Sequence, residues 1–170
     1  DNPVWDQINK AAVKTCETNN CEIRYYSPTQ TNNLEEQNRL MDDVIAAGVD
    51  GILLCPVDSN GMAPAVTRAM EKGIGVSLAT TDIFNSDYVT FAGTANYEAM
   101  MEVAETVAKL LGGKGNVLVL EGNMGAQVGQ DRSKGIKDGL AKYPGIKELA
   151  RQDGNMARAA SMSIVENWLQ

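Results

Sequence analysis

Short apolar runs alternate along the chain with longer stretches in which apolar and polar residues repeat at helical spacing. The clearest run, Ile52–Cys55, is continuously apolar and is followed by Pro56, as expected of a parallel strand that is covered on both faces. Runs of this kind predict strands at about 22–27, 52–55, 74–79, 88–92, 116–121 and 146–151. The first of these alternates only in part, which indicates a strand at the edge of a sheet.

Helices are expected between these strands. Met100, Val103 and Val107 recur three or four positions apart, which places them on one face of a helix, and Gly112 then ends it. The same spacing predicts helices at about 2–18, 34–47, 59–72, 94–111, 127–142 and 156–168. The expected N-caps are Asn2, Asn33, Ser59, and either Thr94 or Asn96.

The order of the elements predicts the fold class. Helices that alternate with strands across short loops indicate an α/β protein with doubly wound parallel sheets. The pattern opens on a helix with no strand before it and closes on a helix with no strand after it. Because βαβ architectures rarely begin or end in this way, we expect a fragment of a larger protein, lacking at least one leading strand and a C-terminal portion.

Composition and charge exclude several partners. The 170 residues carry 15 Lys and Arg against 22 Asp and Glu, a formal net charge of −7, which repels phosphate backbones and anionic lipid surfaces. We therefore expect no nucleic-acid partner. No apolar run approaches the roughly 20 residues of a membrane-spanning helix, so no direct membrane insertion is expected. The first residues lack the basic and apolar regions of a signal peptide, and any export signal is expected upstream.

The three cysteines fit neither a disulfide framework nor a four-ligand metal site. Cys16 and Cys21 lie five positions apart and are able to pair in an oxidising compartment. The favoured reading of Cys16 is a plain apolar helix residue, since it continues the spacing of Ile8 and Ala12. Cys55 ends a buried run and is expected in the core or in the lining of a cleft.

Ligands of open α/β sheets bind beyond the carboxyl ends of the strands. The segments that follow the predicted strands are rich in Asn, Asp, Thr and Gly, which suits neutral, hydroxyl-bearing ligands better than phosphates. The glycine-rich turn 122–129 has the spacing of neither a dinucleotide fingerprint nor a P-loop. The sequence has no His, so the usual general base and imidazole metal ligand are absent. We expect neither an enzyme nor a bound metal or other cofactor.

Four motifs in these segments match one protein family in order and register. They are 2–5 (NPVW), 55–59 (CPVDS), 92–99 (AGTANYEA), and 121–123 (EGN) leading to 130–136 (QDRSKGI). On these residues the chain resembles the type I periplasmic sugar-binding proteins, the ribose/galactose-binding group, which shares its fold with the sensing domains of LacI-type repressors. The resemblance spans essentially all of the chain.

The resemblance implies a periplasmic-binding-protein-like I fold, in which two lobes clamp a sugar or related polyol and deliver it to the membrane permease of an ABC transporter. Residues 1–92 would form the N-terminal lobe without its first strand, and 93–170 the first half of the C-terminal lobe, with the hinge near Phe91–Gly93. The implied location is the periplasm or the extracellular cell surface. The alternative is the effector-sensing domain of a LacI-type transcription regulator, which a DNA-binding headpiece upstream would favour.

The resemblance also implies ligand residues, position by position. Asn2 falls where the family hydrogen-bonds a sugar hydroxyl, and Trp5 where an aromatic ring stacks on the sugar. Arg132 falls at the family's ligand arginine, Thr94 at the hinge beside the ligand, and Met156 where an aromatic residue often closes over the sugar. For Trp5 and Arg132 the alternative is an ordinary buried or solvated helix position.

Three positions depart from the family pattern. Cys55 stands where Asn or Asp is common, and Ala95 where Asp is common. The strand at 74–79 continues as Thr80-Thr81-Asp82, so Asp82 would supply the strand-end carboxylate two residues late. Cys55 and Asp82 are kept as candidate ligand residues. Because each buried sugar hydroxyl needs a partner, these departures predict a less polar or smaller ligand than a fully hydroxylated hexose.

Overall fold

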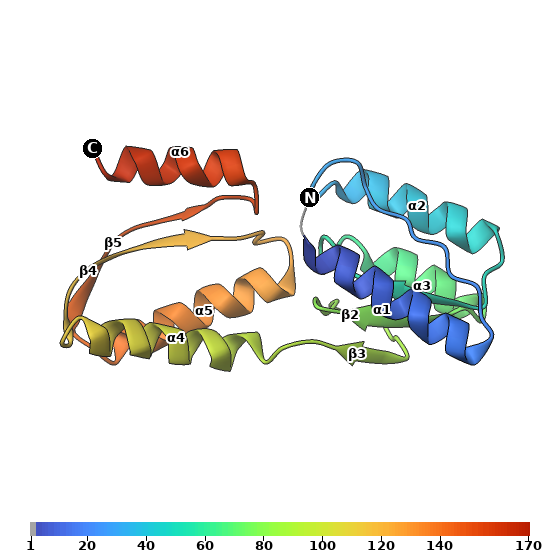
Figure 1. The fold of residues 1–170 in the computed structure, drawn as a ribbon, viewed down its shortest axis with the longest axis horizontal. Helices are drawn as coiled ribbons and strands as arrows, with labels where there is room; N and C mark the ends of the chain where they lie inside the picture. Colours follow the sequence, from blue (N-terminus) through green and yellow to red (C-terminus); the bar gives the residue numbers. More distant parts are fainter. Residues whose placement is uncertain (1–2) are drawn as a thin grey trace.

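The computed structural model describes residues 3–170 as two units, each built on its own parallel sheet (Figure 1). The first unit contains α1 (Pro3–Asn19), α2 (Leu34–Ala46), β1 (Gly51–Leu54), α3 (Ala63–Glu71), β2 (Gly75–Ala79) and β3 (Thr90–Ala92). The second contains α4 (Asn96–Leu110), β4 (Lys114–Glu121), α5 (Gln127–Ala141), β5 (Gly145–Asp153) and α6 (Arg158–Trp168). The α/β class and the parallel sheets predicted from the sequence are confirmed.

The strands of each sheet pair in parallel register. In the first unit the order is β1-β2-β3, with Gly51 opposite Gly75 and Leu78 opposite Phe91. In the second unit β4 pairs with β5 from Lys114 opposite Gly145 onward. Helices α4 and α5 cover one face of this second sheet and α6 lies on the other face (Figure 1).

The hydrophobic core of the first unit lies between β2 and α3. Val76 and Leu78 on β2 are fully buried, as are Val66 on α3 and Met62 just before it. Alternate residues of β2 point into this core because successive side chains of a strand face opposite sides of the sheet. The core therefore fixes the carboxyl end of β2, from which the 80–87 loop extends.

Helices α4 and α5 pack closely because α5 presents glycines to α4. A Cβ atom added at Gly135 would lie 2.3 Å from the carbonyl oxygen of Tyr97, and one added at Gly139 would lie 2.6 Å from that of Met101. Real Cβ atoms do not approach backbone that closely, so any side chain at these positions forces the helices apart. The position of α5, which carries Arg132, depends on this contact.

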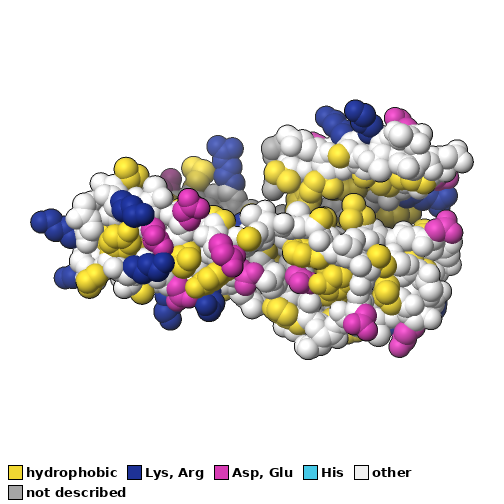
Figure 2. All heavy atoms as spheres, turned by 90° about the horizontal axis from the view of Figure 1, so that it is seen from below, with side chains coloured by type: hydrophobic (Ala, Val, Ile, Leu, Met, Phe, Trp, Pro, Cys, Tyr) yellow, Lys and Arg dark blue, Asp and Glu magenta, His cyan; other side chains and the backbone are white. Residues whose placement is uncertain are grey.

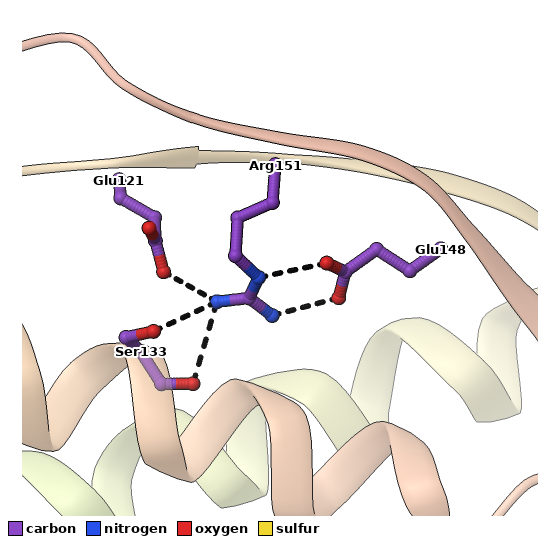
Figure 3. Close-up of polar contacts among 4 residues, drawn as sticks. All are labelled: Glu121, Ser133, Glu148 and Arg151. Carbon is purple, nitrogen blue, oxygen red and sulfur yellow. Dashed lines mark hydrogen bonds and ion pairs between the residues drawn. The ribbon is translucent and has the colours of Figure 1, made fainter.

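Arg151 joins three elements of the second unit (Figure 3). From β5 its guanidinium donates to both carboxylate oxygens of Glu148, each at 2.7 Å, and it is also paired with Glu121 at the end of β4. A further N–H donates to the hydroxyl of Ser133 on α5, at 2.9 Å. The hydrogen bond from Arg151 lowers the pKa of the Glu148 carboxyl. This network holds α5 against the sheet.

The structure departs from the sequence predictions at residues 22–27 and at Ser59. Residues 22–27 form no regular strand, because a strand requires a ladder partner and this segment has none among the described residues. Helix α3 begins at Ala63 after Met62, so Ser59 does not cap it. Asn33, by contrast, caps α2 as predicted, since its side chain accepts a hydrogen bond from the Glu36 amide.

The start of α4 also differs from expectation. Its N-cap is Ala95, which has no capping side chain, and neither Thr94 nor Asn96 takes that role. The Asn96 amide instead donates to the Thr94 carbonyl oxygen at 2.9 Å. The predicted N-cap Asn2 lies outside the described residues.

The cysteines also correct an expectation. Cys16 and Cys21 form a disulfide at the end of α1, so Cys16 is not merely an apolar helix residue. Cys55 is a free thiol and is half-buried, consistent with its predicted place in a core or cleft lining. Disulfides of this kind persist in oxidising compartments.

An apolar groove lies between α1, the 22–27 segment and β1. It measures about 460 Å³ and is lined by Ile8, Ala11, Ala12, Thr15, Cys16, Ile23 and Leu53. Figure 2 shows hydrophobic side chains along a furrow in the first unit, on the right of the view. Among the described residues no helix is both long and apolar enough to cross a membrane.

Gly139→Ala is expected to destabilise the protein by about 1–3 kcal/mol, because the new methyl group meets the Met101 carbonyl. In an open helix the same change stabilises by up to about 1 kcal/mol, so the sign of the effect tests the packing. Urea denaturation measures it. Lys137→Ala, an exposed change on the same helix, is the control; a Gly139→Ala protein as stable as the control contradicts the close packing of α4 and α5.

Arg151→Met is expected to cost about 2 kcal/mol at neutral pH, since it leaves partly buried carboxylates unpaired. The pKa of Glu148 is lowered, so its stabilisation is present above the ordinary value of 4.5 and is lost as the pH falls. The difference between wild type and variant in urea denaturation should therefore shrink in acid. Arg68→Met, which breaks an exposed pair with Asp42, should cost less than about 1 kcal/mol at any pH.

Candidate functional site

The two units meet where the loops that follow their strands face each other. The loop after β1 (55–62) contacts the loop that joins β4 to α5 (122–126). The Ser59 amide donates to the Gly125 carbonyl at 3.1 Å, and the Asn123 side-chain amide donates to the Val57 carbonyl at 2.6 Å. These are the carboxyl ends of parallel strands, the edge at which α/β folds bind ligands.

Ser59 lies at the centre of this junction and is fully buried. Its hydroxyl donates to the carbonyl oxygen of Asp82 at 2.6 Å and accepts from the amide of Gln127 at 2.7 Å. One side chain thus contacts the loop after β2 and the first residue of α5. The sequence suggested a helix cap at Ser59 but assigned it to α3.

Asp82 occupies the loop after β2, as predicted. It is half-buried, and one carboxylate oxygen accepts from the Ile83 amide at 2.7 Å. Its hydrogen bond to Tyr88 raises the pKa of that phenol. The carboxylate therefore lies at the junction and is held by its own loop.

Cys55 follows β1 directly. Its carbonyl oxygen accepts a 2.9 Å hydrogen bond from the buried side chain of Gln37, whose own oxygen accepts from the Val57 amide. Burial raises the pKa of the Cys55 thiol, and a hydrogen bond with Thr80 acts in the opposite direction. The thiol is consequently neutral at neutral pH and presents a weakly polar group.

Arg132 and Thr94 are joined through Asn96. The Arg132 Nε donates to the Asn96 side-chain oxygen at 2.9 Å, and Asn96 in turn donates to the Thr94 carbonyl at 2.9 Å. Within the described part of the chain the terminal nitrogens of Arg132 have no hydrogen-bonded partner. A guanidinium held by Nε keeps its two terminal N–H₂ groups for planar contact with other oxygens.

Asp131 adds a second carboxylate that the sequence analysis did not identify. Burial, followed by the negative charge of Glu98, raises the pKa of the Asp131 carboxyl, and the charge of Asp82 acts in the same direction. The Gln127 side chain donates a hydrogen bond to Asp131 from one turn earlier on α5. Asp82 and Asp131 belong to different units and lie near each other only in the folded protein, so the sequence alone carried no signal that the two carboxylates interact.

Met156 lies between β5 and α6 on a turn in which two successive residues are left-handed, Asn155 at φ 51° and Met156 at φ 55°. Its side chain is 58% exposed and lies against Gly122, where an added Cβ would be 2.7 Å from the Met156 sulfur. Asn155 meets the first unit, because the Asn32 side chain donates to its side-chain oxygen at 2.8 Å.

Trp5 lies in the first turns of α1 with 37% of its surface exposed. No described hydrogen bond links it to the other predicted site residues, and Asn2 lies outside the described residues. The structure therefore places Asp82 at the junction, where Ser59 joins its loop to the start of α5. It groups Arg132 with Thr94 through Asn96, places Cys55 directly after β1, and places Met156 against Gly122 of the β4–α5 loop. Within residues 3–170 no group of three or more potential metal-ligating side chains was found.

The whole chain, residues 1–170, matches the family described as Periplasmic binding protein domain. Among curated proteins it is 32% identical to the xylitol-binding protein of Mycolicibacterium smegmatis, over 89% of this chain and 43% of that protein. It is 29% identical to the galactofuranose-binding protein YtfQ of Escherichia coli, over 80% of this chain and 44% of that protein. The chain thus spans less than half the length of these relatives.

The fold of a solved relative agrees. The crystal structure of an ABC transporter solute-binding protein from Burkholderia graminis, in complex with D-arabinose, superposes with a TM-score of 0.92 at 33% identity. The superposition covers 96% of this chain and 56% of that one. These relatives are solute-binding proteins of the type that the sequence motifs indicated. The chain belongs to the periplasmic binding protein family, with the type I α/β fold.

Proposed function

We propose that this chain is part of the solute-binding component of an ABC importer and binds a monosaccharide or related polyol, without catalysis, in the cleft between two lobes. The observation that carries the proposal is that Asp82 and Asp131, one from each unit, lie close enough for their charges to interact, and that Arg132, the residue after Asp131 on α5, is held by Asn96. Carboxylates accept hydrogen bonds and the guanidinium donates them, so together they can bind a hydroxyl group both as a donor and as an acceptor. The relatives named above supply no support for the alternative of a transcription regulator.

The two lobes are proposed to be residues 1–92 and 93–170. In this division each lobe contains one of the two sheets, and the chain crosses between them after β3, at 93–95. A short connection of this kind, outside any helix or strand, is where hinge closure around a ligand concentrates its backbone rotation.

The ligand is proposed to be neutral. The junction carries Asp82, Asp131 and the nearby Glu98 against Arg132, so a sugar acid or sugar phosphate would bring a further negative charge to an already acidic site. The relatives include a xylitol-binding protein and a protein crystallised with D-arabinose. A thiol at Cys55 and a methyl group at Ala95 offer no strong hydrogen bond, which favours a pentose or polyol over a hexose.

The roles of the individual residues are part of this proposal. Asp82 and Arg132 bind ligand hydroxyls, Trp5 stacks on the apolar face of the ligand, and Met156 covers it from the second lobe. Asn2, Thr94 and Cys55 complete the lining. Delivery to a membrane permease, from the periplasm or the outer cell surface, is proposed from the family.

The Cys16–Cys21 disulfide supports a location outside the cytoplasm. In protein recovered without reductant from the native compartment, alkylation after unfolding should therefore modify Cys55 but not Cys16 or Cys21, and reduction should expose both of these to modification, as peptide mass spectrometry measures. In the chain-entropy treatment, a loop this short stabilises by about 2 kcal/mol, so reduction should lower the urea midpoint. Alkylation of Cys16 and Cys21 before reduction would contradict an oxidising location.

Ligand binding is tested by thermal shift of the complete encoded protein against pentoses, hexoses, polyols and their uronic acids. A neutral ligand at about 100 times its Kd should add roughly 2.7 kcal/mol and raise the Tm by several degrees, whereas the uronic acids should not. Arg132→Ala should lose most of the shift, because it removes the planar donor. Arg39→Ala, an exposed arginine on α2, is the matched control and should keep it. A protein that melts cooperatively with no shift from any sugar contradicts the proposal.

A further inference from the structure

Helix α5 lacks a capping side chain of its own. Its N-cap residue is Ala126, which makes no side-chain hydrogen bond to the first turn. The first backbone N–H groups of a helix have no partner within the helix and need an acceptor from elsewhere. For Gln127, the first residue of α5, that acceptor is the Ser59 hydroxyl at 2.7 Å. Ser59 belongs to the first unit, so α5 is capped from across the junction.

The orientation of the Ser59 hydroxyl is fixed by its second hydrogen bond. Its proton is donated to the Asp82 carbonyl, which leaves a lone pair for the Gln127 amide. The Ser59 carbonyl also accepts from the Phe84 amide at 3.0 Å. One fully buried residue therefore positions both the loop that carries Asp82 and the helix that carries Arg132.

A second contact joins the units away from Ser59. The Asn32 side chain donates to Asn155, at 2.8 Å to its side-chain oxygen and 3.3 Å to its carbonyl. Both residues are left-handed, with φ of 59° and 51°, a conformation that asparagine adopts more readily than most residues. This contact precedes Met156 by one residue, so it holds the turn from which Met156 extends.

We infer that these two contacts form a clasp, Ser59 with Gln127 and Asn32 with Asn155, that holds the units closed without touching the ligand and so sets how slowly the ligand leaves. Ser59 is its main positioning residue, because opening the units removes the cap of α5. The inference rests on the proposed function, since it assigns a role in the retention of the ligand in that cleft. Because both contacts must break before the units separate, losing one of them should speed dissociation far more than it changes association.

The test measures sugar dissociation by stopped flow in the complete protein, with the sugar that gives the largest thermal shift. Ser59→Ala and Asn32→Ala should each raise Kd about fivefold, as expected for one lost hydrogen bond, almost entirely through faster dissociation. Two variants that lose a hydrogen bond within a single unit are the matched controls. Thr67→Ala loses its bonds with the Ala63 carbonyl and the Ser86 hydroxyl, and Asn38→Ala its bonds with the Leu34 and Gly61 carbonyls; both should dissociate like wild type.

Amide hydrogen exchange provides a second measurement that needs no ligand. Ser59→Ala should speed exchange in segment 125–128, at the start of α5, while the helix interior stays protected. Asn32 is only half-buried, so its variant remains informative if Ser59→Ala fails to fold.

The outcomes separate the clasp from the proposed function. Equal dissociation rates in wild type, Ser59→Ala and Asn32→Ala overturn the clasp while leaving sugar binding intact. Slower association at unchanged dissociation also overturns it. If no sugar binds, the proposed function fails and exchange alone decides: faster exchange at 125–128 in Ser59→Ala supports the cross-junction cap, and unchanged exchange overturns it.

Discussion

The hydrogen bond between Ser59 and the start of α5 is the interaction on which the junction depends. Helix α5 carries Arg132 and Asp131 but presents only Ala126 at its N-cap, so the helix takes its acceptor from the other unit. Because the same hydroxyl donates to the Asp82 carbonyl, the two sides of the proposed cleft share one buried side chain. A residue that binds nothing itself can thus control the geometry of those that do.

The position of α5 is also constrained by the elements of its own unit, α4 on one side and the β4–β5 sheet on the other. Gly135 and Gly139 allow the backbone carbonyls of α4 to lie directly against α5. On the other side, Arg151 of β5 links Ser133 of α5 to Glu121 at the end of β4. With both faces of the helix held in this way, Arg132 keeps a fixed place relative to the sheet of the second unit. The packing within the second unit therefore also determines where the residues of α5 lie at the junction.

The chemical character of the junction follows from burial as much as from residue type. Cys55 stays a neutral thiol because burial raises its pKa, and Asp131 is pushed toward its neutral form by burial and by the charge of Glu98. A site of this kind has few strong donors and a negative field. Neutral hydroxyl-bearing molecules satisfy those conditions without introducing a charge that must be desolvated.

The sequence by itself determined the α/β class, the bounds of β2 and α5 to within a residue or so, and hence the loop that carries Asp82 and the helix that carries Arg132. Apolar periodicity is a local property, so it predicts a helix or strand without knowledge of which elements pack against it. Tertiary structure alone decided that residues 22–27 form no strand, that Cys16 pairs with Cys21, and that Ser59 caps α5 rather than α3. Ser59 and Gln127 lie 68 positions apart and Asn32 and Asn155 lie 123 apart, and such partners are chosen by packing, which no local pattern encodes.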